Sequence, residues 1–236
     1  MNAEADQAFD EKFSRVEAIN FGIDFSRKSV IEIGALDKPV TPRDAARVFY
    51  VDHVDTPKLQ EKYRADANVK AQEIVHVGGV WGQKTLAEAA ASVAPVDFIV
   101  ASHVIEHVPD LVTWLKELDS VLTSAGEVRL VVPDKRYCFD FMRSETEIAD
   151  VVAAYVAGAR VPQPQQIADF TLNAVAVDCG STWDGSAQKA VNPRMYDDQG
   201  GLVLAKDALI NGTYHDVHCW VFTPLSFARL MMRLVG

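Results

Sequence analysis

The chain has 236 residues, of which 49% are hydrophobic and 24% are charged, a composition ordinary for a soluble globular protein. This length suits one large domain or a domain that carries a sizeable insertion. A formal net charge of −10 counts against nucleic acid as the main partner, because phosphate binding needs basic patches. No apolar run approaches the roughly 20 residues of a transmembrane helix, so we expect no membrane span.

The N-terminal sequence and the cysteines bear on the compartment. MNAEADQAFDEKF is polar and acidic, and it lacks the basic and apolar regions of a secretory signal. The cysteines, Cys138, Cys179 and Cys219, are odd in number and lack metal-type spacing. We interpret them as reduced thiols, so we expect a cytoplasmic protein. The sequence is compatible with a homo-oligomer.

An N-terminal segment, residues 1–28, precedes a regular alternation of apolar runs and helix-like segments. Its apolar residues at helical spacing predict a short helix outside the main sheet; they are Phe9, Phe13, Val16 and Ile19. The runs that follow are SVIEIG (29–34), RVFYVD (47–52), EIVHVGG (73–79), DFIVASH (97–103) and EVRLVVPD (127–134). Their continuous β-branched content is typical of strands that are covered on both faces. The alternation predicts an α/β fold with a doubly wound, mainly parallel, Rossmann-like sheet.

Helix signals stand between and after these runs. Three Thr-Pro pairs, at Thr41, Thr56 and Thr223, have the pattern of an N-cap followed by proline in the first turn. Thr85 and Glu88 have the spacing of a capping box. The segment PDLVTWLKELDSVL places leucines on one helical face (Leu111, Leu115, Leu118, Leu122), and we expect Gly126 to stop this helix.

The rhythm changes after Asp134. Residues 135–215 contain an amphipathic stretch, TEIADVVAAYVAG, then a Pro/Gln-rich segment and a long loop rich in Gly, Asp and Asn. We interpret them as a helical and loop insertion that forms a cap over a pocket. The predicted organisation is therefore an N-terminal helical segment (1–28), an α/β core (29–134), the insertion (135–215) and a return to the core with a final helix (216–236).

Ligands bind open α/β sheets at the carboxyl ends of the strands, so the residues there are the candidates for a site. Gly34, at the end of the first run, permits close backbone approach. A nucleotide-binding fold places a ribose-binding carboxylate about 20 residues beyond such a glycine, and Asp52 has close to this spacing. A helix-capping or solvated acid is the alternative for Asp52. Glu32 either orients the loop or contacts the ligand.

The stretch VASHVIEHVPD is the most distinctive of the chain. It ends the fourth run with Ser102 and His103, and Glu106 and His107 follow. It is not an H-E-x-x-H helix, because Pro109 indicates that the next helix begins only at that residue, after the histidines. We predict no metal site here, and expect hydrogen bonds that fix the loop, with one histidine facing the pocket.

The motifs VIEIG, VFYVD, DFIVASHVIEHVPD and LDSVLTSAGEVRLVVPD, in this order, resemble the class I S-adenosylmethionine-dependent methyltransferases. The resemblance is to the small methyltransferase-domain proteins associated with glycan biosynthesis; it covers 29–134 and resumes at HDVHCWVFTPLSF (215–227). It implies S-adenosyl-L-methionine as the cofactor. It places Gly34, Ala35 and their neighbours at the methionine part, Asp52 with the adjacent His53 at the ribose, and Ser102 and His103 on the strand-four side.

The sequence departs from the pattern of this family in three places. The second glycine of the E-x-G-x-G loop is Leu36 here, so the loop must follow a different path. The third strand lacks the acid that meets the adenine amine in this family, so Gly78, Gly79 or a backbone carbonyl would have to bind the amine instead. Trp81 either stacks on adenine or packs in the core. The last two strands of the usual fold are expected to be absent, because the sequence stops at Gly236.

Methyl transfer from a sulfonium requires alignment and exclusion of water, with a general base only for a protonated nucleophile. The candidates for such a base are His218 and His103 first, then His215; structural histidines are the alternative for each. The segment YHDVHCW puts His215, Asp216 and His218 close together, so Asp216 is a candidate for a carboxylate that orients a histidine. Lys135, Arg136 and Tyr137 are candidates for binding an anionic acceptor, with a solvated loop as the alternative.

Three functions follow from these residues. The first is an S-adenosylmethionine-dependent methyltransferase whose acceptor is a small molecule, such as a sugar, a nucleotide-sugar or another glycan precursor. The second is a non-catalytic protein that keeps the fold as a binding or scaffold module. The third, an NAD-dependent dehydrogenase, is disfavoured because ALDKP is a poor phosphate cradle.

Overall fold

The computed structural model describes residues 14–42, 47–82, 84–183 and 193–235, and it divides into two compact units. The first unit comprises Met1–Ser102 and Leu118–Val131, and the second comprises His103–Glu117 and Val132–Gly236. Residues 216–236, which the sequence analysis assigned to the core, belong to the second unit. Within the described ranges, every helix is too short or too polar to cross a membrane.

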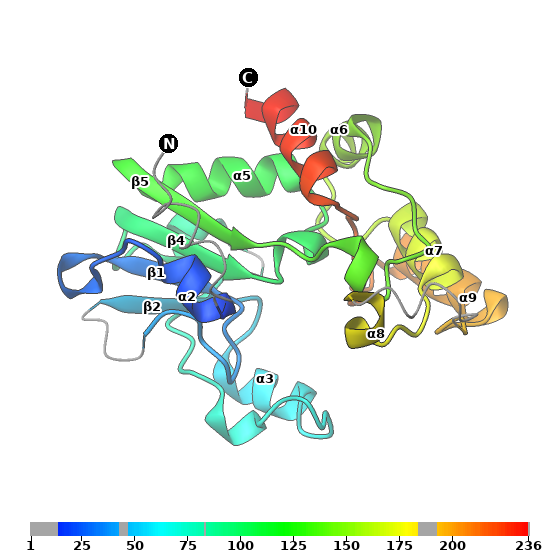
Figure 1. The fold of residues 1–236 in the computed structure, drawn as a ribbon, viewed down its shortest axis with the longest axis horizontal. Helices are drawn as coiled ribbons and strands as arrows, with labels where there is room; N and C mark the ends of the chain where they lie inside the picture. Colours follow the sequence, from blue (N-terminus) through cyan, green and yellow to red (C-terminus); the bar gives the residue numbers. More distant parts are fainter. Residues whose placement is uncertain (1–13, 43–46, 83, 184–192, 236) are drawn as a thin grey trace, which may run out of the picture. The chain divides into compact units, whose positions relative to one another are not determined.

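A five-stranded parallel sheet forms the centre of the first unit (Figure 1). Its strands are β1 (Val30–Ile33), β2 (Val48–Asp52), β3 (Gly79–Val80), β4 (Val96–Ser102) and β5 (Leu122–Val131). Their order is β3-β2-β1-β4-β5, so the strand order reverses between β1 and β4. This is the order of a doubly wound Rossmann-like sheet, and the predicted α/β fold class is confirmed.

Both faces of the sheet are covered, which explains the unbroken apolar runs. On one face, Val30, Phe98 and Val100 pack against Ile19 of helix α2 (Arg15–Asn20). Ser14 and Glu17 form a capping box at the start of this helix. On the other face, a Cβ at Gly79 would lie 2.5 Å from the carbonyl oxygen of Ala89, which belongs to helix α4 (Leu86–Ala89), and 2.8 Å from the ring of Phe49. Phe9 and Phe13 of the predicted N-terminal helix lie outside the described residues.

Two further α-helices and two 3₁₀ turns complete the connections of the first unit. They are α3 (Thr56–Lys62), α4 (Leu86–Ala89), η1 (Phe25–Arg27) and η2 (Ala71–Glu73). The capping box of Thr85 and Glu88 at α4 is confirmed. The N-cap of α3 is Asp55 rather than the predicted Thr56, because Asp55 Oδ1 accepts a hydrogen bond from the Lys58 amide (3.0 Å). The helix predicted after Thr41 falls largely on residues outside the described ranges.

The third predicted strand, 73–79, was wrong over most of its length. The Val75 amide donates to Leu36 O (3.0 Å), and the Val77 amide donates to Thr56 Oγ1 (2.8 Å). These amides are therefore used outside the sheet. The segment joins β2 at its end, where the Gly78 amide donates to Tyr50 O (2.9 Å) and Gly79 pairs with Val51.

The predicted end of the leucine-rich helix was also wrong. Helix α5 (Leu111–Ser120) ends before Leu122, which already pairs with Val96 in the sheet. The pairing then jumps to Phe98 with Glu127, so the intervening residues of β5 form an irregularity rather than a helix end. A Cβ at Gly126 would lie 2.9 Å from the Leu122 side chain, which explains the glycine in this bend.

The described residues of the second unit form helices and loops, with isolated β-bridges between Asp134 and Phe222 and between Val175 and Arg194. Besides η3 (Ile105–His107) and η4 (Lys135–Tyr137), it contains α6 (Ile148–Ala157), α7 (Pro164–Asn173), α8 (Cys179–Trp183), α9 (Asp198–Asn211) and α10 (Pro224–Val235). The Pro/Gln-rich segment forms α7. The segment that was predicted as loop, 178–201, contains α8 and the first turn of α9. Helices α7 and α9 pack side by side (Figure 1). The third Thr-Pro pair does open a helix, α10, as predicted.

Candidate functional site

The loop after β1 turns sharply at the carboxyl end of the strand. Gly34 has a φ of 69°, and its amide donates to Val51 O (3.0 Å), which ties the loop to β2. Leu36 has a φ of 49°, a left-handed conformation that glycine adopts far more readily than leucine. Position 36 thus has the backbone conformation for which glycine is suited. The Leu36 side chain packs against a small cluster around Leu59 and Ile74, which offsets the strain.

Glu32 holds this loop from inside β1. Its side chain is buried, and its two oxygens accept hydrogen bonds from the amides of Val40 (2.7 Å) and Thr41 (3.0 Å). Burial raises the pKa of Glu32, and the hydrogen bonds from Val40 and Thr41 oppose that rise. These contacts fit the loop-orienting alternative.

Asp52 ends β2 with its carboxylate 7% exposed. Its Oδ1 lies 2.7 Å from the amide of His53 and 2.5 Å from His53 Nδ1. The His53 ring, which is nearly half exposed, therefore sits directly on this carboxylate. A ligand diol at Asp52 would have to share or displace the His53 ring.

The two glycines that end the third run, Gly78 and Gly79, are explained by packing. A Cβ at Gly78 would lie 2.5 Å from the Phe49 ring, and one at Gly79 would lie 2.5 Å from the carbonyl oxygen of Ala89. The half-buried Trp81 donates its amide to Asp52 O (2.8 Å), which places it next to the end of β2. At the end of β4, the Ser102 hydroxyl is buried and makes no hydrogen bond to the described residues. Ala35 is buried in the loop itself.

The candidates for acceptor binding, Lys135–Tyr137, form the 3₁₀ turn η4 of the second unit. The Arg136 guanidinium makes a bidentate pair with Asp134, through Nε (3.0 Å) and Nη2 (2.5 Å). It also lies 5.3 Å from the centre of the Tyr137 ring. The Lys135 amide donates to Phe222 O (2.8 Å). The positive charge of Arg136 is thus already balanced within the turn.

The second unit brings Glu106, His107 and His218 together from two distant segments. One ligand-type atom from each of these side chains lies within 4.8 Å of the others. His218 Nδ1 lies 2.6 Å from Asp140 Oδ2, and His218 Nε2 lies 3.9 Å from Glu106 Oε1. The rings of His107 and His218 meet edge to face, with centroids 4.7 Å apart. We call these three side chains the Glu-His-His cluster.

Backbone hydrogen bonds hold the two segments in register. The carbonyl oxygen of Glu106 accepts from the amides of Cys219 (2.6 Å) and Trp220 (3.3 Å). The indole of Trp220 donates to Val108 O (2.6 Å). Because Trp220 and Glu106 are fully buried, the position of His218 relative to Glu106 is fixed by the core of the second unit.

Asp140 connects His218 to a buried arginine. Arg143 Nη1 donates to Asp140 Oδ1 (2.7 Å), while Arg143 Nη2 and Nε reach Asp169 Oδ2 (2.8 and 3.0 Å). Burial would raise the pKa of Asp140, but the hydrogen bond and charge of His218 and the charge of Arg143 outweigh it and hold the pKa below its ordinary value. Asp140 is therefore an anion that fixes the orientation of the His218 ring.

Of the other histidines, His103 lies next to the Glu-His-His cluster, and His215 lies outside it. His103 has a φ of 56°, and its Nδ1 lies 3.5 Å from Glu106 Oε1. His107 Nδ1 lies 2.9 Å from Asp216. His215 pairs instead with Asp207 of α9 (2.8 Å) and is not part of the cluster.

The sequence analysis found the histidines but missed their partners. It paired His215, Asp216 and His218 as one motif, whereas each histidine meets a carboxylate from another part of the chain. Asp140 and Arg143 carried no local signal beyond an acid and a base three residues apart. Glu106 stood beside His107, but nothing in the sequence showed that its carboxylate would be fully buried.

A cavity of about 660 Å³ lies in the second unit. Polar side chains from the start of α6 and α7 contribute to its lining, among them Thr146, Glu147, Gln163 and Gln165. None of the residues nominated from the sequence lines it.

The fold and the strand-end loop define an α/β protein of the Rossmann-like class. No protein-family model and no curated protein matches the chain. Among solved structures, the chain is similar to the crystal structure of the CurJ carbon methyltransferase, with 19% sequence identity and a TM-score of 0.30. The match covers 47% of this chain and 31% of that one, so the chain spans well under half of that protein's length.

Proposed function

We propose that the first unit binds S-adenosyl-L-methionine and that the protein is a methyltransferase for a small-molecule acceptor. The observation that carries this proposal is the state of the amides in the loop after β1. The amides of Lys38, Val40 and Thr41 are bonded within the protein, and Pro39 has none. A dinucleotide needs a row of free amides for its phosphates. A nucleoside cofactor without phosphate does not, which disfavours the dehydrogenase alternative.

The proposed roles follow the reversal of strand order between β1 and β4, where ligands bind in sheets of this kind. Gly34 and Ala35 would face the methionine part of the cofactor. Asp52 would accept hydrogen bonds from the ribose hydroxyls once the His53 ring moves aside. The unpartnered hydroxyl of Ser102 would gain a partner from the ligand, which supports its assignment to the site.

The second unit supplies the proposed acceptor site. A cavity of about 660 Å³ is in the range of small-molecule sites, and the hydroxyl, amide and carboxylate groups among its lining residues suit a polyhydroxylated acceptor such as a sugar. His218, the first candidate for a base, does not line this cavity; Asp140 holds its Nδ1 and leaves Nε2 as the ring atom that it can offer.

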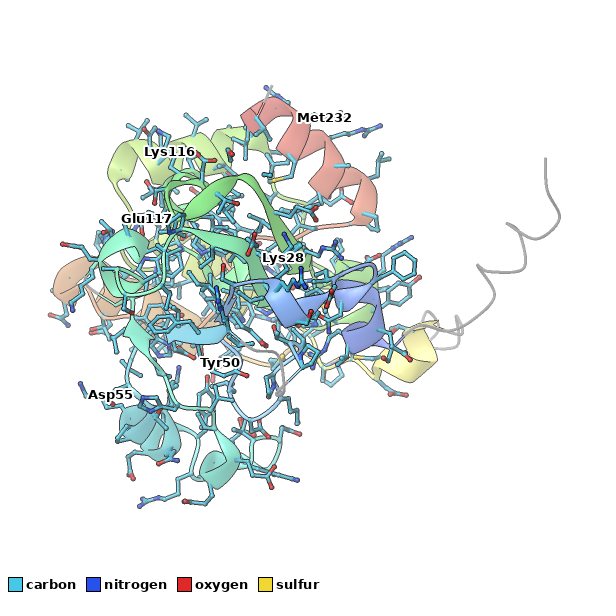
Figure 2. The ribbon with its side chains drawn as sticks, turned by 90° about the vertical axis from the view of Figure 1, so that its left-hand side faces the viewer. Lys28, Tyr50, Asp55, Lys116, Glu117 and Met232 are labelled. Carbon is cyan, nitrogen blue, oxygen red and sulfur yellow. The ribbon has the colours of Figure 1, made fainter. Side chains whose placement is uncertain are left out.

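Calorimetric titration with S-adenosylhomocysteine tests the proposal. We expect binding in the micromolar range, weakened at least about tenfold by Asp52→Asn, because a charge-assisted pair of hydrogen bonds becomes a neutral one. Asp55→Asn is the matched control. Asp55 is labelled beside the start of α3 in Figure 2, and asparagine caps helices as well as aspartate does. Absence of binding heat with S-adenosylhomocysteine would refute the proposed cofactor. An equal loss of affinity in both variants would refute the assignment of Asp52.

The non-catalytic alternative has one supporting observation, the occupation of Asp52 Oδ1 by its own neighbour His53. It predicts cofactor binding without methyl transfer. Transfer of labelled methyl from the cofactor to a panel of sugars and nucleotide-sugars separates the two functions.

A further inference from the structure

We propose that the Glu-His-His cluster of the second unit is a binding site for a divalent transition-metal ion of the Zn²⁺ type. The sequence analysis predicted no metal, because Glu106 and His107 do not form a helical H-E-x-x-H motif. The fold supplies the third side chain, His218, from a segment more than a hundred residues away along the chain. This proposal does not depend on the cofactor or on the methyl transfer proposed above, but it excludes His218 as the general base, because its Nε2 would ligate the ion.

The state of Glu106 is the first argument for a cation. Its side chain is 0% exposed, and neither carboxylate oxygen accepts a hydrogen bond from the described residues. A buried carboxylate without such partners is costly, and proteins pair such groups or bind metal with them. The nearest cationic candidates are the rings of His103 (3.5 Å) and His218 (3.9 Å), both beyond hydrogen-bond distance. A bound ion would provide the missing partner.

The orientation of the two histidines is the second argument. Asp140 holds Nδ1 of His218, and Asp216 lies 2.9 Å from Nδ1 of His107. A histidine that ligates metal through one ring nitrogen commonly gives the other to a carboxylate, which fixes the ring and raises its basicity as a ligand. His218 has this arrangement, and its Nε2 is the atom turned toward Glu106. For His107, the Asp216 carboxylate lies at ion-pair distance from Nδ1.

The charges around the cluster also favour a cation. Three acidic side chains, Glu106, Asp140 and Asp216, lie at the cluster, and the nearby Arg143 is already bound to Asp140 and Asp169. The side chain of His103, about half exposed, lies next to Glu106 in a left-handed backbone conformation that is rare outside glycine. It can provide a further nitrogen or leave a position open to water.

The donor set selects the kind of metal. Two imidazoles and one carboxylate form the set that holds zinc in catalytic sites with an open position, whereas Mg²⁺ and Ca²⁺ prefer oxygen ligands alone. In the tetrahedral geometry of zinc, ligands at about 2.0–2.2 Å from the ion lie about 3.3–3.6 Å from each other. The observed spread of 4.8 Å therefore has to contract by somewhat more than about 1 Å through side-chain rotation when the ion binds.

The test uses the full chain, stripped with a chelator and titrated with Zn²⁺ in calorimetry and with Co²⁺ by visible absorption. We expect one ion per chain and a Co²⁺ spectrum of mixed nitrogen and oxygen ligation. Glu106→Gln and His218→Gln should each weaken Zn²⁺ binding at least about 100-fold, and Asp140→Asn should weaken it about 10–100-fold. Because Glu106 and His218 are buried, His107→Gln, at a half-buried position, gives a variant with less risk to folding.

His215→Gln is the matched control, since His215 also pairs with a carboxylate in the same unit but lies outside the cluster. It should bind Zn²⁺ as the wild type does. Lack of Zn²⁺ binding by the wild type would overturn the proposal. So would unchanged affinity in folded His107→Gln, or an equal loss in His215→Gln.

Discussion

Replacing Arg143 by methionine should destabilise the second unit severely. The guanidinium is 1% exposed and bridges Asp140, which is 2% exposed, and Asp169, which is 37% exposed. Removing one partner of a buried ion pair costs about 3–5 kcal/mol, because the other charge loses its compensation. Asp140 keeps its contact with His218 Nδ1 (2.6 Å), so we expect a loss near the lower end of this range. The more exposed Asp169 is screened by solvent, so losing its pair with Arg143 lowers the free energy of unfolding by about 0–1 kcal/mol. The expected loss therefore comes almost wholly from Asp140.

Denaturant unfolding followed by tryptophan fluorescence measures this loss, since Trp220 is buried in the same unit. Arg136→Met is the control, because Arg136 forms the same kind of pair with Asp134 but is more than half exposed. We expect a change of at most about 1 kcal/mol in the control. Arg143→Lys should fall between the two, because a single ammonium cannot serve both carboxylates as the planar guanidinium does. A loss for Arg143→Met no larger than for Arg136→Met would refute the reasoning.

Two further predictions concern pH and thiol reactivity. Burial raises the folded-state pKa of Glu32 above its ordinary 4.5, so its contribution to the free energy of unfolding should be fully present below pH 4.5 and lost as pH rises through the folded-state value. Glu32→Gln should remove this component, and parallel stability–pH curves for variant and wild type would contradict it. A thiol reagent should modify the exposed Cys179 in the folded protein, and Cys138 and Cys219 only after unfolding, because burial raises the pKa of both, that of Cys138 to about 12. Peptide mass mapping that finds Cys219 modified first would be inconsistent with this.

Strands that are set by local sequence were predictable. The runs at β1, β2 and β4 are continuous and apolar because both of their faces are covered, and this pattern is visible without the fold. The third run is equally apolar, yet most of it stays out of the sheet. Its amides are taken by Leu36 O and the Thr56 hydroxyl, and those partners become neighbours only after folding. Helix α9 was missed for a related reason: its glycines and aspartates suggest a loop, but its alanines pack inside the unit.

The histidine cluster shows the same limit for function. Sequence spacing placed Asp216 next to His218 and made it the natural orienting acid, but Asp140, 78 residues away, takes that role. A histidine with Nδ1 held in this way can present only Nε2, whether it serves as a base or as a metal ligand. The group next to Nε2 decides whether His218 serves as a base or as a metal ligand. Glu106, buried and without a hydrogen-bond partner among the described residues, gives an acceptor hydroxyl little to bind, whereas an ion would satisfy both side chains at once.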